Sequence, residues 1–238
     1  MTTTTRRSMA PETDRVAVTT AGGQQCALNF AAAPDQPERL AAGASLLRGF
    51  AVPAGADLLD ALHALQAVSA FRQMVTPGGF PMSVAVSNCG ALGWTSSRQG
   101  YRYTARDPDT GQAWPPMPEA FWRLARDAAA HAGFPHFDPD ACLINRYRPG
   151  ARLTLHQDRN ERDFSQPIVS VSLGMSATFV FGGLSRTGKT AKLPLHHGDV
   201  VVWGGPDRLR YHGVLPLPDL PHPLLGRQRI NLTFRKAG

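Results

Sequence analysis

Beyond Pro139, short apolar runs alternate with turn-forming residues along the rest of the chain. Eight such runs follow one another: CLINRYR, RLTLH, IVSVSL, TFVFGG, KLPL, DVVVWGG, RYHGVLPL and RINLTFR. Many short strands separated by turn residues predict a β-sandwich or jelly roll. We see no repeat of fixed period and no second domain boundary in this series. The pattern therefore predicts one mainly β domain of the α+β class.

Two amphipathic helices are expected before this β-rich region. The segment 54–71 spaces its apolar residues three or four apart, which is typical of a helix that packs on one face. These residues are Leu58, Leu62, Leu65 and Val68. A second helix should begin at Pro118 and Glu119, a favourable first turn, and end at Gly133. Its apolar face should hold Phe121, Leu124, Ala128 and Ala132.

The remaining segments show little periodicity. Residues 75–114 contain glycines and aromatic residues and predict short strands and loops. Residues 1–36 are rich in Thr, Ala, Gly and Pro and have almost no large apolar side chains. This composition predicts a disordered tail. We therefore expect a disordered tail over 1–38 and a single domain over 39–238.

The charge balance favours a polyanionic partner. Lys and Arg number 25 against 18 Asp and Glu, which gives a formal net charge of +7, and the sequence pI is about 9.9. An excess of basic side chains suits nucleic acid. Charge alone is equally consistent with an ordinary solubilising surface, so this alternative stays open.

Cysteine usage and hydropathy bear on the cellular compartment. Cys26, Cys89 and Cys142 are odd in number and form no C-x-x-C pair, so neither a disulfide framework nor a zinc ribbon is expected. No apolar run reaches the ~18 residues that would span a bilayer. The residues after Arg6 and Arg7 lack the apolar core of an export signal. We expect a soluble, cytoplasmic protein without membrane contact.

The segment that ends at Asp158 holds the first candidate chemistry. Residues two apart in a strand face the same side, so the imidazole of His156 and the carboxylate of Asp158 would converge. His212 follows several predicted strands later, where the sheet can return to the same place. Two histidines and one carboxylate form the facial triad of non-haem Fe(II) oxygenases. This spacing alone is weak evidence for a metal site.

A competing pair of histidines is adjacent in the sequence. His196 and His197 would point to opposite faces of a strand, so they cannot easily bind one ion. We interpret both as structural residues near the turn that precedes DVVVWGG.

The last predicted strand, 229–235, alternates strictly between polar and apolar residues. Its polar face would carry Arg229, Asn231, Thr233 and Arg235. A solvated edge strand would show the same alternation and is the simpler reading of this strand alone. However, Asn145 and Tyr147 alternate in the same way on an earlier strand. Guanidinium groups bind carboxylates bidentately, so the two strands together would suit a small dicarboxylate such as 2-oxoglutarate.

An aromatic group lies in the aperiodic segment. Trp94, Tyr101 and Tyr103 are interleaved with Arg98 and Arg102. Aromatic side chains mixed with arginines suit base stacking and phosphate contact. A tryptophan that caps a hydrophobic core would look the same in sequence, so this alternative also stays open.

Longer motifs carry a family resemblance. They are FRQMVTPGGFPMSVAVSNCGALGWTSSRQGYRY, PDACLINRYRPGARLTLHQD, PIVSVSLG, FGGL, HGDVVVWGG, RYHGV and RINLTFRKAG. Over residues 40–238 the chain resembles the AlkB family of Fe(II)/2-oxoglutarate-dependent nucleic-acid dioxygenases, and its bacterial members in particular. The resemblance implies a double-stranded β-helix (jelly-roll) core over 139–238, supporting N-terminal helices and a nucleotide-recognition lid over 71–115.

The resemblance also implies the residues of the site. Fe(II) would be held by His156, Asp158 and His212. 2-Oxoglutarate would be bound by Asn145, Tyr147, Arg229, Asn231 and Arg235. Within this set, Arg229 would hold the distal carboxylate and Arg235 would lie near the end that chelates iron. Both sets agree with the residues that strand alternation selects.

The lid residues of the family correspond to Thr76, Met82, Trp94, Tyr101 and Tyr103. Residues near the nucleic-acid strand correspond to Arg152, Gln157, Arg159, Asn160 and Arg186. Trp94 would stack on a flipped base opposite His156. Asn160 stands where bacterial members have a carboxylate that faces the base, and an amide lacks the charge that favours a cationic methylated base.

The expected activity follows from the family. It is oxidative demethylation of bases such as 1-methyladenine and 3-methylcytosine, with Fe(II) as cofactor and 2-oxoglutarate and O2 as cosubstrates. The products are formaldehyde, succinate and CO2. The expected partner is alkylated DNA, single strands being favoured, or RNA, and we expect a monomer. Two alternatives are a 2-oxoglutarate oxygenase with a non-nucleic-acid substrate and a non-catalytic nucleic-acid-binding β domain.

Overall fold

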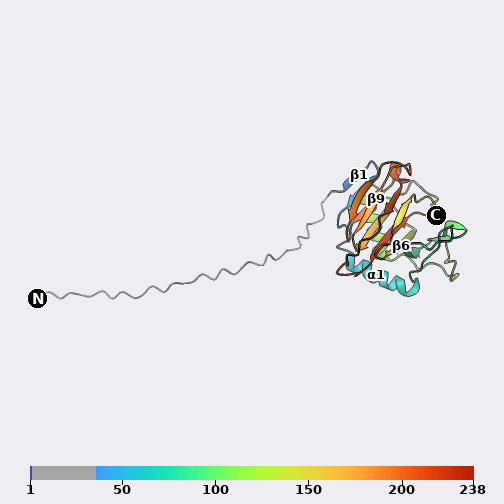
Figure 1. Cartoon of the computed structure of the whole chain (residues 1–238), viewed down its shortest axis with the longest axis horizontal. Helices are drawn as coiled ribbons and strands as arrows, with labels where there is room; N and C mark the ends of the chain where they lie inside the picture. The colour runs from blue at the N-terminus through green and yellow to red at the C-terminus, as the bar shows by residue number, and fades with distance from the viewer. Residues whose placement is uncertain (2–35) are drawn as a thin grey trace. The chain divides into compact units, whose positions relative to one another are not determined.

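The computed structural model describes Met1 and residues 36–238. Two antiparallel sheets dominate the domain (Figure 1). The larger sheet has seven strands in the order β1 (Glu38–Ala41), β2 (Ala44–Leu47), β11 (Val200–Trp203), β8 (Ile168–Gly174), β13 (Arg229–Arg235), β6 (Ala141–Tyr147) and β3 (Ala85–Gly90). The smaller sheet has the order β10 (Ala191–Leu195), β9 (Ala177–Phe181), β12 (His212–Val214) and β7 (Leu153–His156).

Two helices, one hairpin and one short 3-10 turn complete the described chain. Helices α1 (Gly55–Val68) and α2 (Glu119–His131) precede the jelly-roll strands, and Figure 1 shows α1 lying across the lower side of the sheets. Strands β4 (Gly93–Ser97) and β5 (Gly100–Thr104) form a separate two-stranded hairpin. A single 3-10 turn, η1 (Gly205–Asp207), lies between β11 and β12. The predicted α+β, mainly β jelly roll with supporting helices is confirmed.

Two hydrophobic cores lie on opposite faces of the seven-stranded sheet. On one face the helices pack through Leu58 and Phe121 against strand residues such as Ile144 and Leu232. On the other face the two sheets pack together, and Trp203 of the larger sheet contacts the ring of Phe179 of the smaller one, with centroids 6.1 Å apart. Burial of apolar side chains on both faces holds the three layers together.

Both predicted helices are present. Leu58, Leu62 and Leu65 are buried on one face of α1, as the spacing predicts. Val68 was expected on the same face, but its side chain is 73% exposed because the helix ends at this residue. The second helix begins at Glu119, and Gly133 follows its end with φ +93°, a conformation that favours glycine.

All eight predicted β runs form strands, β6 to β13. Strand β13 lies between β8 and β6 inside the larger sheet, and all seven of its residues are buried. The alternative of a solvated edge strand is therefore wrong. Its apolar residues Ile230, Leu232 and Phe234 belong to the core beneath the helices, so its polar residues face the space between the sheets.

Strands β1 to β5 were not predicted individually. Strands β1 and β2 form a hairpin that extends the larger sheet at β11, and β3 extends it at β6. The proposed lid segment 71–115 thus contributes β3 to the larger sheet and keeps only β4, β5 and the turns around them as a separate unit. The expected tail over 1–38 lies, except for Met1 and residues 36–38, outside the described residues.

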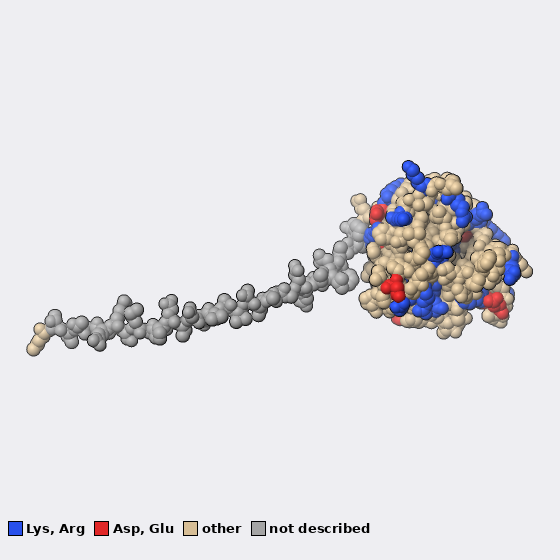
Figure 2. All heavy atoms as spheres, in the orientation of Figure 1, with Lys and Arg blue, Asp and Glu red and all other residues tan. Residues whose placement is uncertain are grey.

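On the face of the described domain drawn in Figure 2 most of the surface is uncharged, and basic side chains are spread over it more widely than acidic ones. Neither helix of the described chain is long and apolar enough to cross a membrane.

Candidate metal and cosubstrate site

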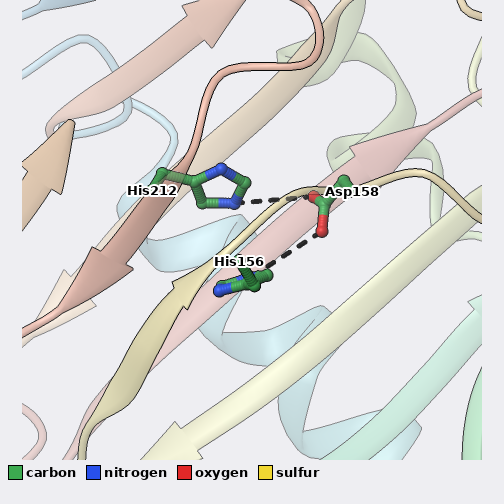
Figure 3. A group of neighbouring side chains, drawn as sticks. All are labelled: His156, Asp158 and His212. Atoms are coloured by element: carbon green, nitrogen blue, oxygen red, sulfur yellow. Dashed lines mark ion pairs between the residues drawn. The ribbon is translucent and has the colours of Figure 1, made fainter. Parts of the chain in front are cut away.

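Three side chains that could hold a metal ion meet at the end of the smaller sheet. His156 ends β7, Asp158 lies in the loop that follows, and His212 begins β12. One ligand atom from each residue lies within 4.8 Å of the other two. His156 Nε2 is 3.8 Å from Asp158 Oδ1, and His212 Nε2 is 3.8 Å from Asp158 Oδ2. Figure 3 shows both imidazoles beside the carboxylate. Within residues 36–238, no other grouping of three such residues is found.

Strand register brings the two histidines together. Strands β7 and β12 pair so that His212 lies directly opposite His156. Gly213 allows this close approach, because a Cβ atom there would lie 2.7 Å from the carbonyl oxygen of Leu153. The position of Asp158 has a different cause from the one predicted. Strand β7 ends at His156, so strand alternation does not reach Asp158, and loop contacts must hold it.

Backbone hydrogen bonds fix both imidazoles in the tautomer that leaves Nε2 free to bind a metal. The Nδ1 atom of His156 lies 2.8 Å from the carbonyl oxygen of Thr154, and Nδ1 of His212 lies 3.1 Å from that of Arg210. A carbonyl oxygen can only accept, so each Nδ1 carries the hydrogen and donates it. Each Nε2 is left with a free lone pair toward Asp158, and such carbonyl contacts are typical of metal-ligating histidines.

The surroundings of His212 keep its imidazole neutral, and those of Asp158 keep its carboxylate ionised. Burial, together with neighbouring His156, lowers the pKa of His212 to about 4, although Asp158 opposes this shift. Burial alone would raise the pKa of Asp158, but the Arg235 guanidinium and the two imidazoles outweigh it and hold this pKa well below its ordinary value. Neutral imidazole and ionised carboxylate are the forms that bind a divalent ion.

Arg235 contacts the carboxylate of Asp158 directly. Its Nε and Nη2 atoms donate to Oδ2 at 3.0 and 2.5 Å. This places a guanidinium from β13 beside the three candidate metal ligands. The resemblance predicts Arg235 near the end of the cosubstrate that chelates iron, and the residue lies beside one of the predicted iron ligands.

Arg229, at the other end of β13, is a buried cation without enough partners. Its Nη2 donates to Ser172 Oγ at 2.9 Å, while Nε and Nη1 are buried and have no hydrogen-bond partner in the described chain. Burial lowers its pKa, and the neighbouring Tyr147 ring, 4.9 Å from the guanidinium carbon, opposes the shift. Leaving buried charged donors unpaired is costly. The geometry therefore fits an anionic ligand such as a carboxylate.

Asn145 and Asn231 are cross-strand partners on β6 and β13. The amide nitrogen of Asn231 donates to Ser170 Oγ and to the carbonyl oxygen of Val171, at 2.8 and 2.9 Å. Its oxygen accepts from the Thr233 hydroxyl at 3.0 Å. The hydrogen-bonding groups of Asn231 are thus already used within the sheet. Asn231 would therefore help to bind a ligand through the shape of the cavity wall and not through new hydrogen bonds.

One cavity of about 320 Å³ joins the metal grouping to the lid. All five predicted cosubstrate residues line it: Asn145, Tyr147, Arg229, Asn231 and Arg235. So do seven of the predicted substrate residues: Thr76, Met82, Trp94, Tyr101, Arg152, Gln157 and Asn160.

Trp94 stacks on Tyr101 with ring centroids 5.4 Å apart and an interplanar angle of 17°. The two rings form an aromatic wall of the cavity.

Three predicted substrate residues lie elsewhere. Tyr103 does not line this cavity, and its hydroxyl donates to Glu161 Oε1 at 2.8 Å. Arg159 is exposed outside the cavity, and the guanidinium carbon of Arg186 lies 5.9 Å from the Tyr211 ring centroid.

The competing histidines, His196 and His197, make structural contacts. His196 Nδ1 contacts Ser176 Oγ, and His197 Nδ1 accepts a hydrogen bond from the Gly174 amide.

Sequence reasoning missed several cavity residues. Phe179 and Trp203 line the cavity wall beside His212, with ring centroids 5.9 and 4.9 Å from its imidazole. Both lie in apolar runs that predict only core strands, so their sequence context gave no functional signal. Leu143 and Ser170 also line the cavity and were not selected, whereas Thr233 was already expected on the polar face of β13.

A facial set of two histidines and a carboxylate, beside a buried guanidinium with two unpaired donors, fits Fe(II) and a dianionic cosubstrate. Together with the jelly-roll fold, this site defines an Fe(II)- and 2-oxoglutarate-dependent oxygenase. The family model of the 2OG-Fe(II) oxygenase superfamily matches residues 43–235. The chain belongs to this superfamily, as a member of the AlkB family of α-ketoglutarate-dependent dioxygenases.

The relatives of the chain span bacteria to humans. It is 57% identical over 209 residues to the α-ketoglutarate-dependent dioxygenase AlkB of Escherichia coli (strain K12), covering 88% of this chain and 97% of the relative. It is 39% identical over 115 residues to human nucleic acid dioxygenase ALKBH1, covering 46% of this chain and 30% of that protein. The solved structure of OsALKBH1 matches 84% of this chain and 99% of its own, with a TM-score of 0.73 and 29% identity.

Proposed function

We propose that this dioxygenase removes alkyl groups from nucleic-acid bases, with bases of the 1-methyladenine and 3-methylcytosine type as substrates. Formaldehyde, succinate and CO2 are the products. One observation carries the proposal: a single cavity of about 320 Å³ joins the metal grouping, the unpaired Arg229 guanidinium and the stacked Trp94 and Tyr101 rings. An oxidising site beneath an aromatic wall suits a flat heterocycle that carries an N-alkyl group.

In this proposal His156, Asp158 and His212 hold Fe(II), and Arg229 binds the distal carboxylate of 2-oxoglutarate. Tyr147 packs against the Arg229 guanidinium, and Asn145 and Asn231 shape the wall between the two arginines. When bound, Fe(II) with 2-oxoglutarate and O2 supplies the oxidation of an N-methyl group to an unstable hemiaminal, which releases formaldehyde. Arg235 would supply a positive charge next to Asp158 and next to the end of 2-oxoglutarate that lies nearest the metal.

Trp94 and Tyr101 hold the base over His156 in the proposed complex. A methyl group on the pairing edge is out of reach in a duplex, so the base must leave the stack, and damage lowers the cost of doing so. Single strands are therefore the easier substrate. Arg152 and Gln157 at the cavity, and Arg159 and Arg186 on the surface, provide polar and cationic contacts along the strand.

Support for nucleic acid comes from chemistry and from relatives. The net charge of +7 and the spread of basic side chains in Figure 2 suit a phosphate chain. A human relative is named a nucleic acid dioxygenase. We propose DNA as the main substrate, with RNA as a second one, and a monomeric enzyme. We propose a cytoplasmic location, and the free, buried thiols of Cys89 and Cys142 suit a reducing compartment.

The test is formaldehyde release from a matched panel. Single-stranded and double-stranded DNA oligonucleotides, RNA oligonucleotides and peptides would each carry one N-methyl group, and each would be incubated with Fe(II), 2-oxoglutarate and O2. We expect release from the oligonucleotides and none from the peptides. Release from peptides alone would overturn the nucleic-acid assignment, and the absence of release from every substrate with intact 2-oxoglutarate binding would overturn demethylation.

A further inference from the structure

A buried carboxylate outside the metal grouping connects the lid to the site. The side chain of Glu161 is 2% exposed. It accepts a hydrogen bond from the Tyr103 hydroxyl at 2.8 Å, and its Oε1 lies 3.4 Å from Arg235 Nε. Its other oxygen, Oε2, lies 3.2 Å from Arg208 Nη2. Glu161 thus contacts three elements that are far apart in the sequence.

Glu161 shares Arg235 with Asp158. The Arg235 Nε atom donates to Asp158 Oδ2 at 3.0 Å and lies 3.4 Å from Glu161 Oε1, so one guanidinium edge faces both carboxylates. A buried cation attracts whatever anion is nearest, and the attraction is strong where water is excluded. Asp158 is the nearer counter-charge of Arg235, and without the Glu161 charge it would be the only carboxylate against this guanidinium edge. That contact would compete with the binding of a divalent ion by Asp158.

Arg208 holds the loop that carries both carboxylates. Its side chain is buried, and its Nη1 donates to the carbonyl oxygen of Asp158 at 2.9 Å while Nε donates to that of Gln166 at 3.0 Å. With the Glu161 ion pair, Arg208 therefore fixes both ends and the middle of segment 158–166. This segment follows β7, so the contacts set where Asp158 lies relative to His156.

Tyr103 connects this network to the aromatic wall of the cavity. It lies on β5 directly opposite Trp94 of β4, and Tyr101 lies two residues before it. Cross-strand partners and residues two apart share one face of a hairpin, so the three rings face the same side. Burial raises the pKa of Tyr103 well above its ordinary value, with Glu161 acting in the same direction. The phenol therefore stays protonated and remains a donor.

We propose that Glu161 is a positioning residue that makes nucleic-acid binding and cosubstrate binding interdependent. A base that settles against Trp94 and Tyr101 fixes the hairpin, Tyr103 then fixes Glu161, and Glu161 holds the Arg235 edge that faces Asp158 and the cosubstrate. The inference rests on the proposed function, because it takes a nucleic-acid base as the ligand of the lid. By linkage, each ligand then raises the affinity for the other by the same factor.

Two variants separate the parts of this connection. Tyr103→Phe removes the hydrogen bond of the lid and keeps the Glu161 charge. Glu161→Gln keeps an oxygen that can accept from Tyr103 and removes the charge. Trp114→Phe is the matched control, because Trp114 Nε1 donates to the Thr104 carbonyl on β5 at 2.8 Å and is not part of the Glu161 network. It removes one buried hydrogen bond of the same hairpin.

The measurement is equilibrium binding without turnover. A fluorescein-labelled oligonucleotide with one methylated base would be titrated with Co(II)-loaded protein in the absence and presence of 2-oxoglutarate, and anisotropy would give both Kd values. For the native protein we expect 2-oxoglutarate to tighten binding by about fivefold or more. In Tyr103→Phe and Glu161→Gln this ratio should fall close to one, whereas Trp114→Phe should retain it.

A second readout isolates the charge effect. In the absence of oligonucleotide, Glu161→Gln should weaken 2-oxoglutarate binding to the Co(II) protein about tenfold, while Tyr103→Phe should leave it nearly unchanged. The proposal is overturned if Tyr103→Phe keeps the native ratio, or if the native protein itself shows a ratio of one. Failure of the proposed function looks different, since the native protein would then release no formaldehyde from any methylated oligonucleotide.

Discussion

His156 and His212 are direct cross-strand partners, and their ring centroids lie 4.4 Å apart. They come from strands β7 and β12, so one register of one strand pair sets the distance between two candidate metal ligands. A shift of the register by one residue would turn one imidazole to the opposite face of the sheet. The spacing of the two imidazoles in the candidate metal site therefore depends on the pairing of these two short strands.

Replacement of His156 by Ala should abolish formaldehyde release while the fold is retained, because its imidazole lies at the cavity and is 38% exposed. Circular dichroism and thermal unfolding would check the fold, and a visible spectrum of the anaerobic protein with Fe(II) and 2-oxoglutarate would check the metal complex. His196→Ala is the control, since the His196 imidazole contacts Ser176 Oγ and does not line the cavity. Activity of the His156 variant equal to that of the control would refute the ligand assignment.

Replacement of Arg229 by Met should separate binding from stability. Each charge-assisted hydrogen bond to the cosubstrate contributes about 1.5 to 3 kcal/mol, so the loss of one or two should raise the KM for 2-oxoglutarate at least roughly tenfold. The free protein should lose little stability or gain some, because Nε and Nη1 of Arg229 are buried without partners. Denaturant unfolding and steady-state kinetics measure the two effects, and an unchanged KM would remove Arg229 from this role.

The metal-free protein should lose stability on acidification. The pKa of His212 is about 4 in the fold and 6.5 without it, so near pH 5 the unfolded chain binds a proton that the folded chain does not. His212 therefore leaves the free energy of unfolding nearly unchanged well above pH 6.5 and lowers it as the pH falls toward 4. Between pH 7.5 and pH 5 the free energy of unfolding should fall by about 2 kcal/mol on account of this residue.

Urea unfolding in the presence of a chelator, at both pH values, tests this expectation. His212→Gln has no titrating imidazole at this position, so its stability should depend less on pH by the same amount. Equal pH dependence in the two proteins would contradict the buried, neutral state of His212.

Replacement of Asn160 by Asp should shift base preference. Asn160 lines the cavity with an exposed amide, and a carboxylate there would attract a cationic base such as 1-methyladenine. An added attraction of about 1 kcal/mol in this partly solvated position corresponds to roughly a fivefold rise in kcat/KM. Neutral methylated bases should gain nothing. Formaldehyde release by both proteins would be measured with oligonucleotides that carry either a cationic or a neutral methylated base. An equal change in kcat/KM for the two kinds of base would contradict a charge effect.

Strand alternation predicted much of the larger sheet. The polar face of β13 lines the cavity and its apolar face packs under the helices, because period two is imposed by backbone geometry alone. The same reasoning selected Asn145 and Tyr147 on β6. Where a segment is not a strand, this logic fails: Asp158 reaches the histidines through loop contacts with Arg208 and Arg235, which the sequence pattern does not indicate.

Glu161 shows a second limit of sequence reasoning. Its partners Tyr103, Arg208 and Arg235 are each about 45 to 75 residues away along the chain, since the ion pairs form only after three separate elements pack together. No periodicity links positions at such separations. Strands β1 and β2 also escaped prediction, because their place beside β11 is set by pairing within the sheet and not by a pattern in their own residues.

The separate β4–β5 hairpin has an evolutionary consequence. The aromatic residues proposed to hold the base, Trp94 and Tyr101, lie on this hairpin, whereas the candidate metal ligands lie on the smaller sheet and the loop after β7. Substitutions on the hairpin at positions other than Tyr103 should therefore alter which base is accepted while the candidate metal ligands keep their places. Such a division would let one scaffold take different substrates with the same chemistry.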